Sequence, residues 1–336
     1  MKKLSLIDKF LLIVNLILTI VLLTSFLSYY ISPNSIPFIA VLSLFQPVLI
    51  VLNVIFIIFW ILKFNRFFLI STLGLLLGFQ YVSAFYSFKE KVVMLENDVK
   101  IMSYNVRMFN LYKWIVEDNV DQKIFDFINK KDPDILCIQE NHSSKKIGFK
   151  FPYKFIKVSN IENHTGLAIY SKFKIINSGS LNFLKSTNNA IFVDILKNND
   201  TVRIYNIHLE SLKINPKEEK LTQENSEKLK IRLENAFKIQ ANQSTLILEH
   251  QNKINHKSII CGDFNNTAFS WVYKNLKEGK NDAFEKAGKG FGDTYVFPFP
   301  FRIDFILTDK KMEVNNFKTY DVKYSDHYPI MARVRF

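Results

Sequence analysis

Cysteine is scarce in this chain of 336 residues, which contains only Cys137 and Cys261. Each lies inside an apolar, strand-like run of residues. Two such cysteines do not make a disulfide framework, and a thiol in an apolar run is more often a small core residue than a catalyst or a metal ligand. The sequence therefore argues against a small disulfide-bonded scaffold and leaves the redox compartment open.

Charge is nearly absent from residues 1–88, which hold five basic side chains and one acidic one: Lys2, Lys3, Lys9, Lys63, Arg66 and Asp8. Three apolar stretches in this segment contain no charge: Phe10–Ile31, Ile36–Leu62 and Phe67–Phe85. A helix needs about 20 apolar residues to cross the core of a bilayer. We therefore expect an all-α transmembrane anchor of three helices, the third of which is diluted by Ser71, Thr72, Gln80 and Ser83. The lack of charge within the stretches argues against a transporter or channel.

A cleavage site of the Ala-x-Ala type is also missing after the first stretch, which favours an uncleaved anchor over a signal peptide. Residues 32–35, between the first two stretches, contain no Lys or Arg, whereas the amino end and the loop with Lys63 and Arg66 do. The positive-inside rule then puts the amino end in the cytoplasm and, after three crossings, the C-terminal domain outside. Lys89 and Lys91 weigh mildly against this orientation. The expected location is a bacterial-type inner membrane, with the lipid bilayer as a partner.

The remainder of the chain is basic and resembles a soluble domain. Of the 44 basic and 31 acidic residues in the chain, 39 and 30 lie beyond residue 88, which leaves a formal charge of about +9 there. Such a charge suits anionic partners, including nucleic acid, phospholipid head groups and a membrane surface. A lysine-rich surface that only keeps the domain soluble is the alternative.

Residues 98–336 show short β-rich runs separated by turn residues. Strands are predicted at residues 99–106, 134–140, 166–172, 190–196, 201–209, 257–264, 302–309 and 328–336. Helical patterns occupy residues 121–130, about 216–251 and 270–276. Several strand runs are continuously apolar, as expected for strands buried between another sheet and helices. The pattern predicts an α+β domain in which two sheets pack face to face with helices outside.

Short polar motifs end the apolar runs of this domain: SYNVR, IQE, NIHLE, GDFNN, RIDF and SDH. They supply Asn105, Glu140, His208, Asp263, Asn265, Asp304, Asp326 and His327. Hydrolysis of a phosphoester requires a hard cation held by oxygen ligands, a positioned water, and groups that stabilise the charged oxygens. Carboxylates, amides and imidazoles gathered at strand ends can meet these requirements, although any one motif alone is weak.

Two of these motifs make specific predictions. Asp263 and Asn265 are two residues apart, so both face the same side of an extended chain, unless GDFNN merely forms a turn. Asp304 lies within an apolar run, where an unpaired carboxylate is costly, so it needs a partner, and His327 is the natural candidate. A carboxylate bonded to one imidazole nitrogen fixes the tautomer and raises the basicity of the ring. Asp326, next to His327, would face another direction and could serve a metal.

These motifs, in this order, resemble those of the endonuclease/exonuclease/phosphatase family, which includes deoxyribonuclease I and the neutral sphingomyelinases. The resemblance covers about residues 98–336 and implies a four-layered αββα sandwich with Mg²⁺-dependent attack of water on phosphorus, Mn²⁺ being an alternative. The implied roles are as follows: Asn105, Glu140 and Asp326 surround the metal, Asp263 orients the nucleophile with help from Asn265, His327 paired with Asp304 contacts the phosphate, and His208 is a further catalytic histidine.

Arg107 departs from the abasic-site endonucleases, which resemble this chain less and carry an acidic residue at that place. A second metal ligand is therefore in doubt, and the cation could bind substrate phosphate or simply lie on the surface. His164, before the run TGLAIYSK, is a weaker candidate for the substrate side. Thr294 and the run YVFPFPFR precede Asp304 and predict either a rim loop or aromatic packing.

The sequence thus predicts a membrane-anchored, metal-dependent phosphoester hydrolase with an anchor in residues 1–88 and a catalytic domain in residues 98–336. The substrate is expected to be nucleic acid, a phospholipid head group or a nucleotide. The alternative is a catalytically inactive, membrane-anchored binding protein of the same fold.

Overall fold

The computed structural model describes residues 4–142, 148–160, 164–184, 186–214 and 223–336. Among these residues, twelve strands form two six-stranded sheets. The first sheet contains, in spatial order, β11 (Glu313–Thr319), β12 (Ile330–Arg335), β1 (Val99–Asn105), β2 (Ile135–His142), β4 (Thr165–Ser171) and β3 (Tyr153–Asn160). The second contains β5 (Lys174–Ser180), β6 (Asn189–Lys197), β7 (Asp200–His208), β8 (Lys257–Asp263), β10 (Asp304–Asp309) and β9 (Lys280–Asp282).

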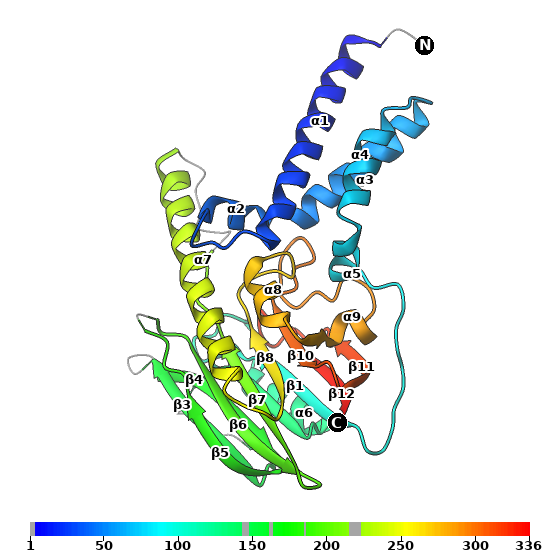
Figure 1. The fold of residues 1–336 in the computed structure, drawn as a ribbon. Coiled ribbons are helices and arrows are strands. Elements are labelled where there is room, and N and C mark those ends of the chain that lie inside the picture. Colours follow the sequence, from blue (N-terminus) through cyan, green and yellow to red (C-terminus); the bar gives the residue numbers. More distant parts are fainter. Residues whose placement is uncertain (1–3, 143–147, 161–163, 185, 215–222) are drawn as a thin grey trace.

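The two sheets pack face to face, and helices cover their outer faces (Figure 1). The core between the sheets contains Ile101 and Cys137 from the first sheet and Ile204 and Cys261 from the second. Helix α6 (Val120–Lys131) packs on the outer face of the first sheet. Helices α7 (Gln223–Gln251) and α8 (Trp271–Lys277) pack on the outer face of the second. The predicted sandwich of two sheets between helices is confirmed, and both cysteines are buried and free.

All eight predicted strands are present, but four further strands were not predicted: β3, β5, β9 and β11. Each of the four lies at an edge of a sheet. The predicted helices near residues 121–130 and 270–276 correspond to α6 and α8, and the longest one corresponds to α7. The expected beginning of that longest helix, residues 216–222, lies outside the described residues. A short helix after β9, α9 (Ala283–Ala287), was not predicted either.

The first 88 residues fold into helices, but the three-span prediction is not confirmed. In the described part of the chain, one helical segment, Leu6–Tyr29, is long and apolar enough to cross a membrane, a test that a signal sequence also passes. It comprises α1 (Leu6–Phe26) and a 3-10 turn. The second expected span is split into α2 (Pro37–Leu42) and α3 (Gln46–Leu62), and in the third α4 (Phe68–Leu77) ends at Gly78 before α5 (Val82–Phe85). Proline restricts the residue before it and lacks the N–H that a helix interior needs, which explains why α3 begins beside Pro47.

Helices α1, α3 and α4 form a bundle with a polar interior. The Asn15 side chain donates to Ser71 Oγ at 2.6 Å and accepts from Trp60 Nε1 at 3.0 Å. Thr19 Oγ1 donates to Asn53 Oδ1 at 2.8 Å, and all five side chains are buried. The outward-facing side chains are large and apolar, and many of them are more than half exposed: Ile7, Phe10, Ile17, Ile58 and Leu76.

The N-terminal helices also pack on the sandwich, at the loop that follows β8. Ser28 Oγ donates to the Phe269 carbonyl at 3.0 Å, and Thr267 Oγ1 donates to the Ser43 carbonyl at 3.3 Å. Leu22 belongs to the same buried cluster as the residues on the outer face of the second sheet. Helix α2 packs against α7 through a smaller apolar cluster. The two parts of the chain are therefore held together by buried contacts (Figure 1).

Candidate active site

The polar motifs converge because two parallel strand pairs end at the same edge of the sandwich. In the first sheet β1 pairs with β2, which places Asn105 opposite Gln139, next to Glu140. In the second, β7 pairs with β8, which places His208 opposite Asp263. Strand β10 runs antiparallel to β8 and begins at this edge, so Asp304 also lies opposite Asp263. The sheet registers therefore bring residues that are distant in sequence to a single site.

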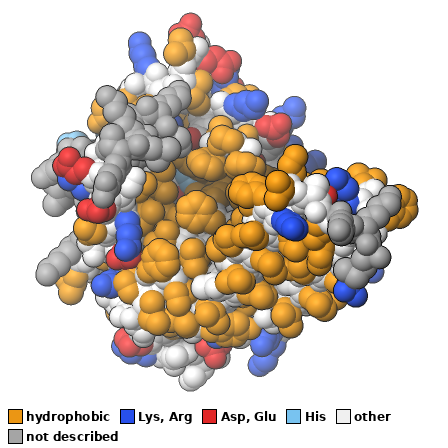
Figure 2. All heavy atoms as spheres, turned by 90° about the horizontal axis from the view of Figure 1, so that it is seen from above, with side chains coloured by type: hydrophobic (Ala, Val, Ile, Leu, Met, Phe, Trp, Pro, Cys, Tyr) orange, Lys and Arg blue, Asp and Glu red, His pale blue; other side chains and the backbone are white. Residues whose placement is uncertain are grey.

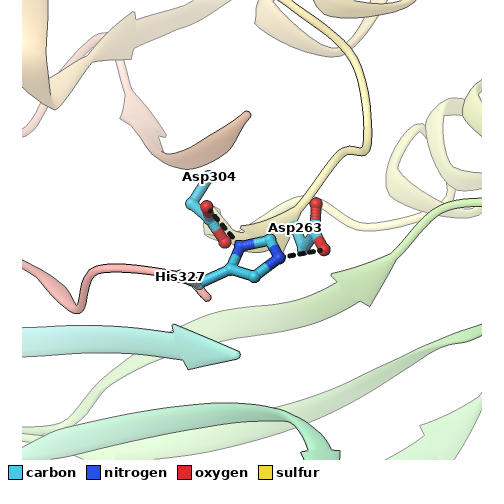
Figure 3. A group of neighbouring side chains, drawn as sticks. All are labelled: Asp263, Asp304 and His327. Atoms are coloured by element: carbon cyan, nitrogen blue, oxygen red, sulfur yellow. Dashed lines mark hydrogen bonds and ion pairs between the residues drawn. The ribbon is translucent and has the colours of Figure 1, made fainter. Parts of the chain in front are cut away.

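The His327 imidazole lies between two buried carboxylates (Figure 3). Its Nδ1 is 2.9 Å from Asp304 Oδ2, so the expected contact between these residues is present. Its Nε2 is 3.7 Å from Asp263 Oδ2. Burial opposes the charged ring, but Asp304 and Asp263 outweigh this and raise the pKa of His327 to about 10. The ring is accordingly protonated near neutral pH, with both nitrogens acting as donors.

Asp263 is the most enclosed acid of the site, and burial raises its pKa to about 6. One carboxylate oxygen accepts the Asn265 backbone N–H at 2.7 Å, and the other accepts Asn105 Nδ2 at 3.1 Å. The preceding Gly262 has φ +139°, and a Cβ there would lie 2.0 Å from the Ile207 carbonyl oxygen. Only glycine fits this approach of β8 to β7, which sets the position of Asp263.

His208 and Asn265 flank Asp263. His208 Nε2 is 3.5 Å from Asp263 Oδ2, and burial lowers the pKa of His208, which favours its neutral form. The Asn265 side chain turns away from Asp263, and its Nδ2 donates to the Leu209 carbonyl at 3.0 Å. In this arrangement Asn265 contributes its backbone N–H to the site and its side chain to the loop after β7.

Glu140 follows Gln139 at a bulge in the pairing of β2 with β4, and its φ of +52° lies in the left-handed region. That backbone conformation is uncommon for a residue with a side chain and is often found at functional sites. Burial and the neighbouring Asp326 carboxylate raise the pKa of Glu140. Asn105 Nδ2 donates to Glu140 Oε1 at 3.2 Å, while Asn105 Oδ1 accepts the Arg107 backbone N–H at 3.1 Å.

Arg107 is held at the rim of the site. Its guanidinium is 3.2 Å from Asp326 Oδ2 and lies over the ring of Trp114, 4.4 Å from the centroid. For His164, by contrast, the described residues show no contact with the cluster. It is exposed at the start of β4, and its ring lies 6.3 Å from that of His142. No hydrogen bond or ion pair among the described residues joins it to the site, so its predicted place beside the substrate gains no support.

Three further residues support the site, and only Gln240 was not singled out in the sequence. Thr294 Oγ1 accepts the backbone N–H groups of Ile303 and Asp304, at 3.0 and 3.1 Å, and so fixes the start of β10. The Tyr295 ring lies 5.0 Å from that of His327. Gln240 of α7 donates to the carbonyls of Glu210 and Asn265. A polar residue on a long helix gives no sequence signal for such contacts, whereas Thr294 and Tyr295 lie in the run already noted as a possible rim loop.

The site opens into a cavity of about 170 Å³. Its lining contains Glu140, His208, Asp263, Asn265, Asp326 and His327, and most of its other lining residues are apolar. The ligand atoms of Asp263, Asp304 and His327 lie within 4.8 Å of one another, close enough to hold a metal ion. Glu140 and Asp326 offer a second set of hard oxygen donors at the same cavity.

A family model decides the relationship of this site to known proteins. Residues 102–327 match the model described as the endonuclease/exonuclease/phosphatase family. This chain belongs to that family. The predicted resemblance is therefore confirmed over the domain that carries the cluster. Residues 8–85 match a separate model, described as a domain of unknown function (DUF8431).

Several solved structures share the fold of this chain. The human Nocturnin catalytic domain with bound sulfate is 19% identical, with a TM-score of 0.56, and the match covers 73% of this chain and 96% of that one. A mannosyl-6-phosphatase from Bacteroides thetaiotaomicron is 18% identical, with a TM-score of 0.53 and coverages of 71% and 100%. Humanized D. rerio TDP2 is 16% identical, with a TM-score of 0.53 and coverages of 72% and 100%. No curated protein matches the sequence.

Proposed function

We propose that this member of the family is a metal-dependent phosphoester hydrolase, with its catalytic domain in residues 98–336. The observation that carries the proposal is the placement of Asp263 between His208 and His327, with His327 bonded to Asp304. A hydrolase needs a group that takes a proton from water beside a group that donates to a phosphoryl oxygen. The carboxylate and the protonated imidazole supply this combination in one buried cluster.

The chain's own residues suggest the proton transfers. With a pKa of about 6, Asp263 is ionised near neutral pH, so it orients a water and accepts its proton as the water oxygen bonds to phosphorus. His327, protonated with a pKa of about 10, donates a hydrogen bond to a non-bridging oxygen. Asp304 keeps that ring charged and oriented. The bond from phosphorus to the leaving oxygen breaks, and that oxygen takes a proton from solvent. His208, which stays neutral, and the Asn265 backbone N–H position Asp263.

The donor set of the cavity fits a hard divalent cation. Burial and the Asp326 carboxylate raise the cost of ionising Glu140, as its raised pKa indicates, and a cation bound by both carboxylates would relieve that cost. Oxygen donors of this kind are those that Mg²⁺ and Mn²⁺ prefer. When bound, the cation neutralises phosphoryl charge. Asn105 would become a further ligand if its amide rotated so that Oδ1 faced the cation. That rotation would break the hydrogen bond that Oδ1 accepts from the Arg107 backbone N–H.

The cluster of Asp263, Asp304 and His327 is the other candidate for the cation. We assign it to proton chemistry instead, because His327 Nδ1 is engaged by Asp304 and the protonated ring has no free lone pair. The two assignments differ in one measurable respect. Glu140→Gln should weaken Mn²⁺ binding by about 10-fold or more, whereas His327→Gln should leave it within about 2-fold; the reverse order would contradict our assignment.

We further propose that residues 1–88 anchor the protein in a membrane as a bundle of α1, α3 and α4. The bundle has an apolar exterior and a polar interior whose side chains hydrogen-bond to one another. This arrangement suits a lipid environment, where polar side chains have no water as a hydrogen-bond partner. Asp8 pairs with Lys63 at 3.1 Å, so the amino end and the loop after α3 lie on one side of the bundle. With the positive-inside rule, this favours a cytoplasmic amino end and an extracytoplasmic catalytic domain in a bacterial-type inner membrane.

The hydrolase proposal is tested with the full chain in detergent and a soluble chromogenic diester, bis(p-nitrophenyl) phosphate. After removal of metals by a chelator, we expect no release of nitrophenol, and addition of Mg²⁺ or Mn²⁺ should restore it. Turnover that persists in excess chelator would contradict a metal mechanism. Absence of turnover with any divalent metal, together with retained binding of phosphoesters, would favour the alternative, an inactive membrane-anchored binding protein.

A further inference from the structure

Much of the lining of the catalytic cavity is apolar. Leu212, Ile214, Phe297, Phe301 and Ile303 line it beside the acidic and imidazole groups and form what we call its apolar wall. Ile214 and Phe297 are each 37% exposed, so their apolar surface is available to a ligand. A nucleotide or a sugar phosphate presents hydroxyl groups that need hydrogen-bond partners, and this wall offers few. A ligand with hydrocarbon next to its phosphate would bury the apolar surface of the wall, which is favourable because that surface leaves water.

This apolar wall continues into the docked N-terminal helices. Leu212 belongs to a buried cluster with Ala40 and Val41 of α2. Phe301 also lines a crevice together with Pro47 and Phe85 of the N-terminal segment. The apolar wall of the cavity therefore adjoins the N-terminal segment, whose bundle helices have an apolar exterior.

The cavity lies close to the N-terminal segment. The loop after β8, which carries Asn265, holds the N-terminal segment through Thr267 and Phe269. Large apolar side chains outside the bundle helices are exposed as well: Phe38 at 50%, Phe45 at 53% and Phe299 at 45%. Figure 2, which looks down on this end of the molecule, shows hydrophobic side chains spread across most of the view. A bilayer around α1, α3 and α4 would thus lie near the cavity.

We propose that the substrate is the phosphoester of a membrane lipid, with its phosphate among Asp263, His327 and Glu140 and its hydrocarbon on the apolar wall. This inference rests on the proposed hydrolase function. The exposed Lys213, which also lines the cavity, supplies a cation at the mouth for an anionic head group. The lipid reaches the site from the adjoining leaflet, so that its acyl chains remain in or beside the bilayer.

The test compares diesters that share a leaving group and differ only in hydrocarbon: methyl, octyl and hexadecyl p-nitrophenyl phosphate. The full chain is assayed in detergent for the first two and in phosphatidylcholine vesicles for the third. We expect kcat/KM to rise at least 10-fold from methyl to octyl and hexadecyl turnover to exceed both. Equal efficiency with all three, or a higher efficiency with single-stranded DNA, would overturn the lipid inference while the hydrolase stands. No turnover of any diester would instead overturn the proposed function.

Substitutions in the apolar wall test whether its residues cause the preference for the longer hydrocarbon. Ile214→Ser combined with Phe297→Ser should reduce the octyl-to-methyl ratio of kcat/KM to within about 2-fold of unity. The matched control is Ile176→Ser, which changes a 48% exposed isoleucine on β5, outside the cavity lining, and should retain the wild-type ratio. Both altered wall residues are partly exposed, so folding should survive, and circular dichroism checks this. A ratio that does not change in the double variant would contradict the role of the wall.

Discussion

At the residue scale, the site depends on buried ionisable groups that are each paired. The sequence predicted that Asp304 needs a partner, because an isolated buried carboxylate is costly, and His327 lies at 2.9 Å from it. The same reasoning applies to Arg302 and Asp282, which pair at 2.6 Å, but no motif marked Asp282 beforehand. The sequence pattern therefore identified the partner of Asp304, whereas the pairing of Asp282 with Arg302 comes from tertiary packing that no motif marked.

The first prediction concerns Asp304→Asn. The amide keeps the shape of the carboxylate but no longer holds His327 as a charged, oriented donor, so kcat should fall by about 10²- to 10⁴-fold. Mn²⁺ affinity should change little, because Asp304 is not a proposed ligand. Stopped-time assays with bis(p-nitrophenyl) phosphate and Mn²⁺ titrations measure both. Asp200→Asn, an exposed acid at the opposite end of β7, is the matched control. A kcat within 3-fold of wild type for Asp304→Asn would contradict the pairing argument.

The second prediction concerns the Asp282 and Arg302 pair, which supports β10 from outside the site. Asp282 also accepts the Tyr273 hydroxyl at 2.6 Å and the Phe284 backbone N–H at 2.8 Å. Breaking such a buried pair leaves an uncompensated charge, so Asp282→Asn should lower the free energy of unfolding by about 3–5 kcal/mol. Urea denaturation of the full chain in detergent measures it.

The pH dependence of that loss has a defined sign. Burial opposes ionisation of Asp282, but Arg302 outweighs it and holds the folded-state pKa below the usual 3.8. Its contribution is therefore complete above pH 3.8 and is lost as the pH falls through the folded-state value. The difference in unfolding free energy between wild type and Asp282→Asn should be constant from pH 5 to 7 and shrink in more acidic solution. A difference that grows on acidification would refute the assignment.

At the element scale, prediction succeeded inside the sheets and failed at their edges. Interior strands are buried on both faces and read as continuous apolar runs, such as residues 257–263 of β8. The missed strands β3, β5, β9 and β11 are all edges. Strand β5 is mostly exposed and polar, and β9 has three residues, so neither has the apolar pattern that marks a strand. The bulge at Glu140 could not be predicted from the sequence either, because it depends on how β2 pairs with β4.

The third prediction tests the close approach of β8 to β7 at Gly262. An alanine Cβ there would lie 2.0 Å from the Ile207 carbonyl oxygen, at a φ that side chains rarely adopt. Gly262→Ala should cost about 2 kcal/mol or more of unfolding free energy and displace Asp263. Gly279→Ala also has a positive φ but open space around it, and it should cost only about 1 kcal/mol. Equal costs in urea denaturation would show that sterics at Gly262 are unimportant.

At the scale of the whole molecule, composition predicted an apolar N-terminal part and a soluble domain, but not how they meet. A hydrophobic run has the same composition whether it is buried in lipid or in protein. Three runs of sufficient length therefore predicted three membrane spans. Turns at residues 43–45 and 78–81 shorten two of them. The contacts of Ser28 and Ser43 with the loop after β8 come from tertiary packing, which no local sequence pattern reveals.

The fourth prediction concerns the membrane. If the bundle is embedded in lipid, the full chain expressed in bacterial cells should remain in the membrane pellet after extraction at pH 11. A fusion of alkaline phosphatase after Phe336 should be active, since the C-terminal end would lie outside the cytoplasm. Release of the chain by alkaline buffer would contradict the anchor. An inactive fusion in a chain retained by the pellet would reverse the orientation and leave the anchor intact.

The central claim is that Asp263 and His327 act together in metal-dependent hydrolysis, and one measurement addresses it most directly. It is the rate of bis(p-nitrophenyl) phosphate hydrolysis in saturating Mg²⁺ by the full chain, by Asp263→Ala and by His327→Ala, with folding checked by circular dichroism. We expect wild-type turnover that a chelator abolishes, and a loss of about 10²-fold or more in each variant. Folded variants that keep near-wild-type turnover would contradict the account.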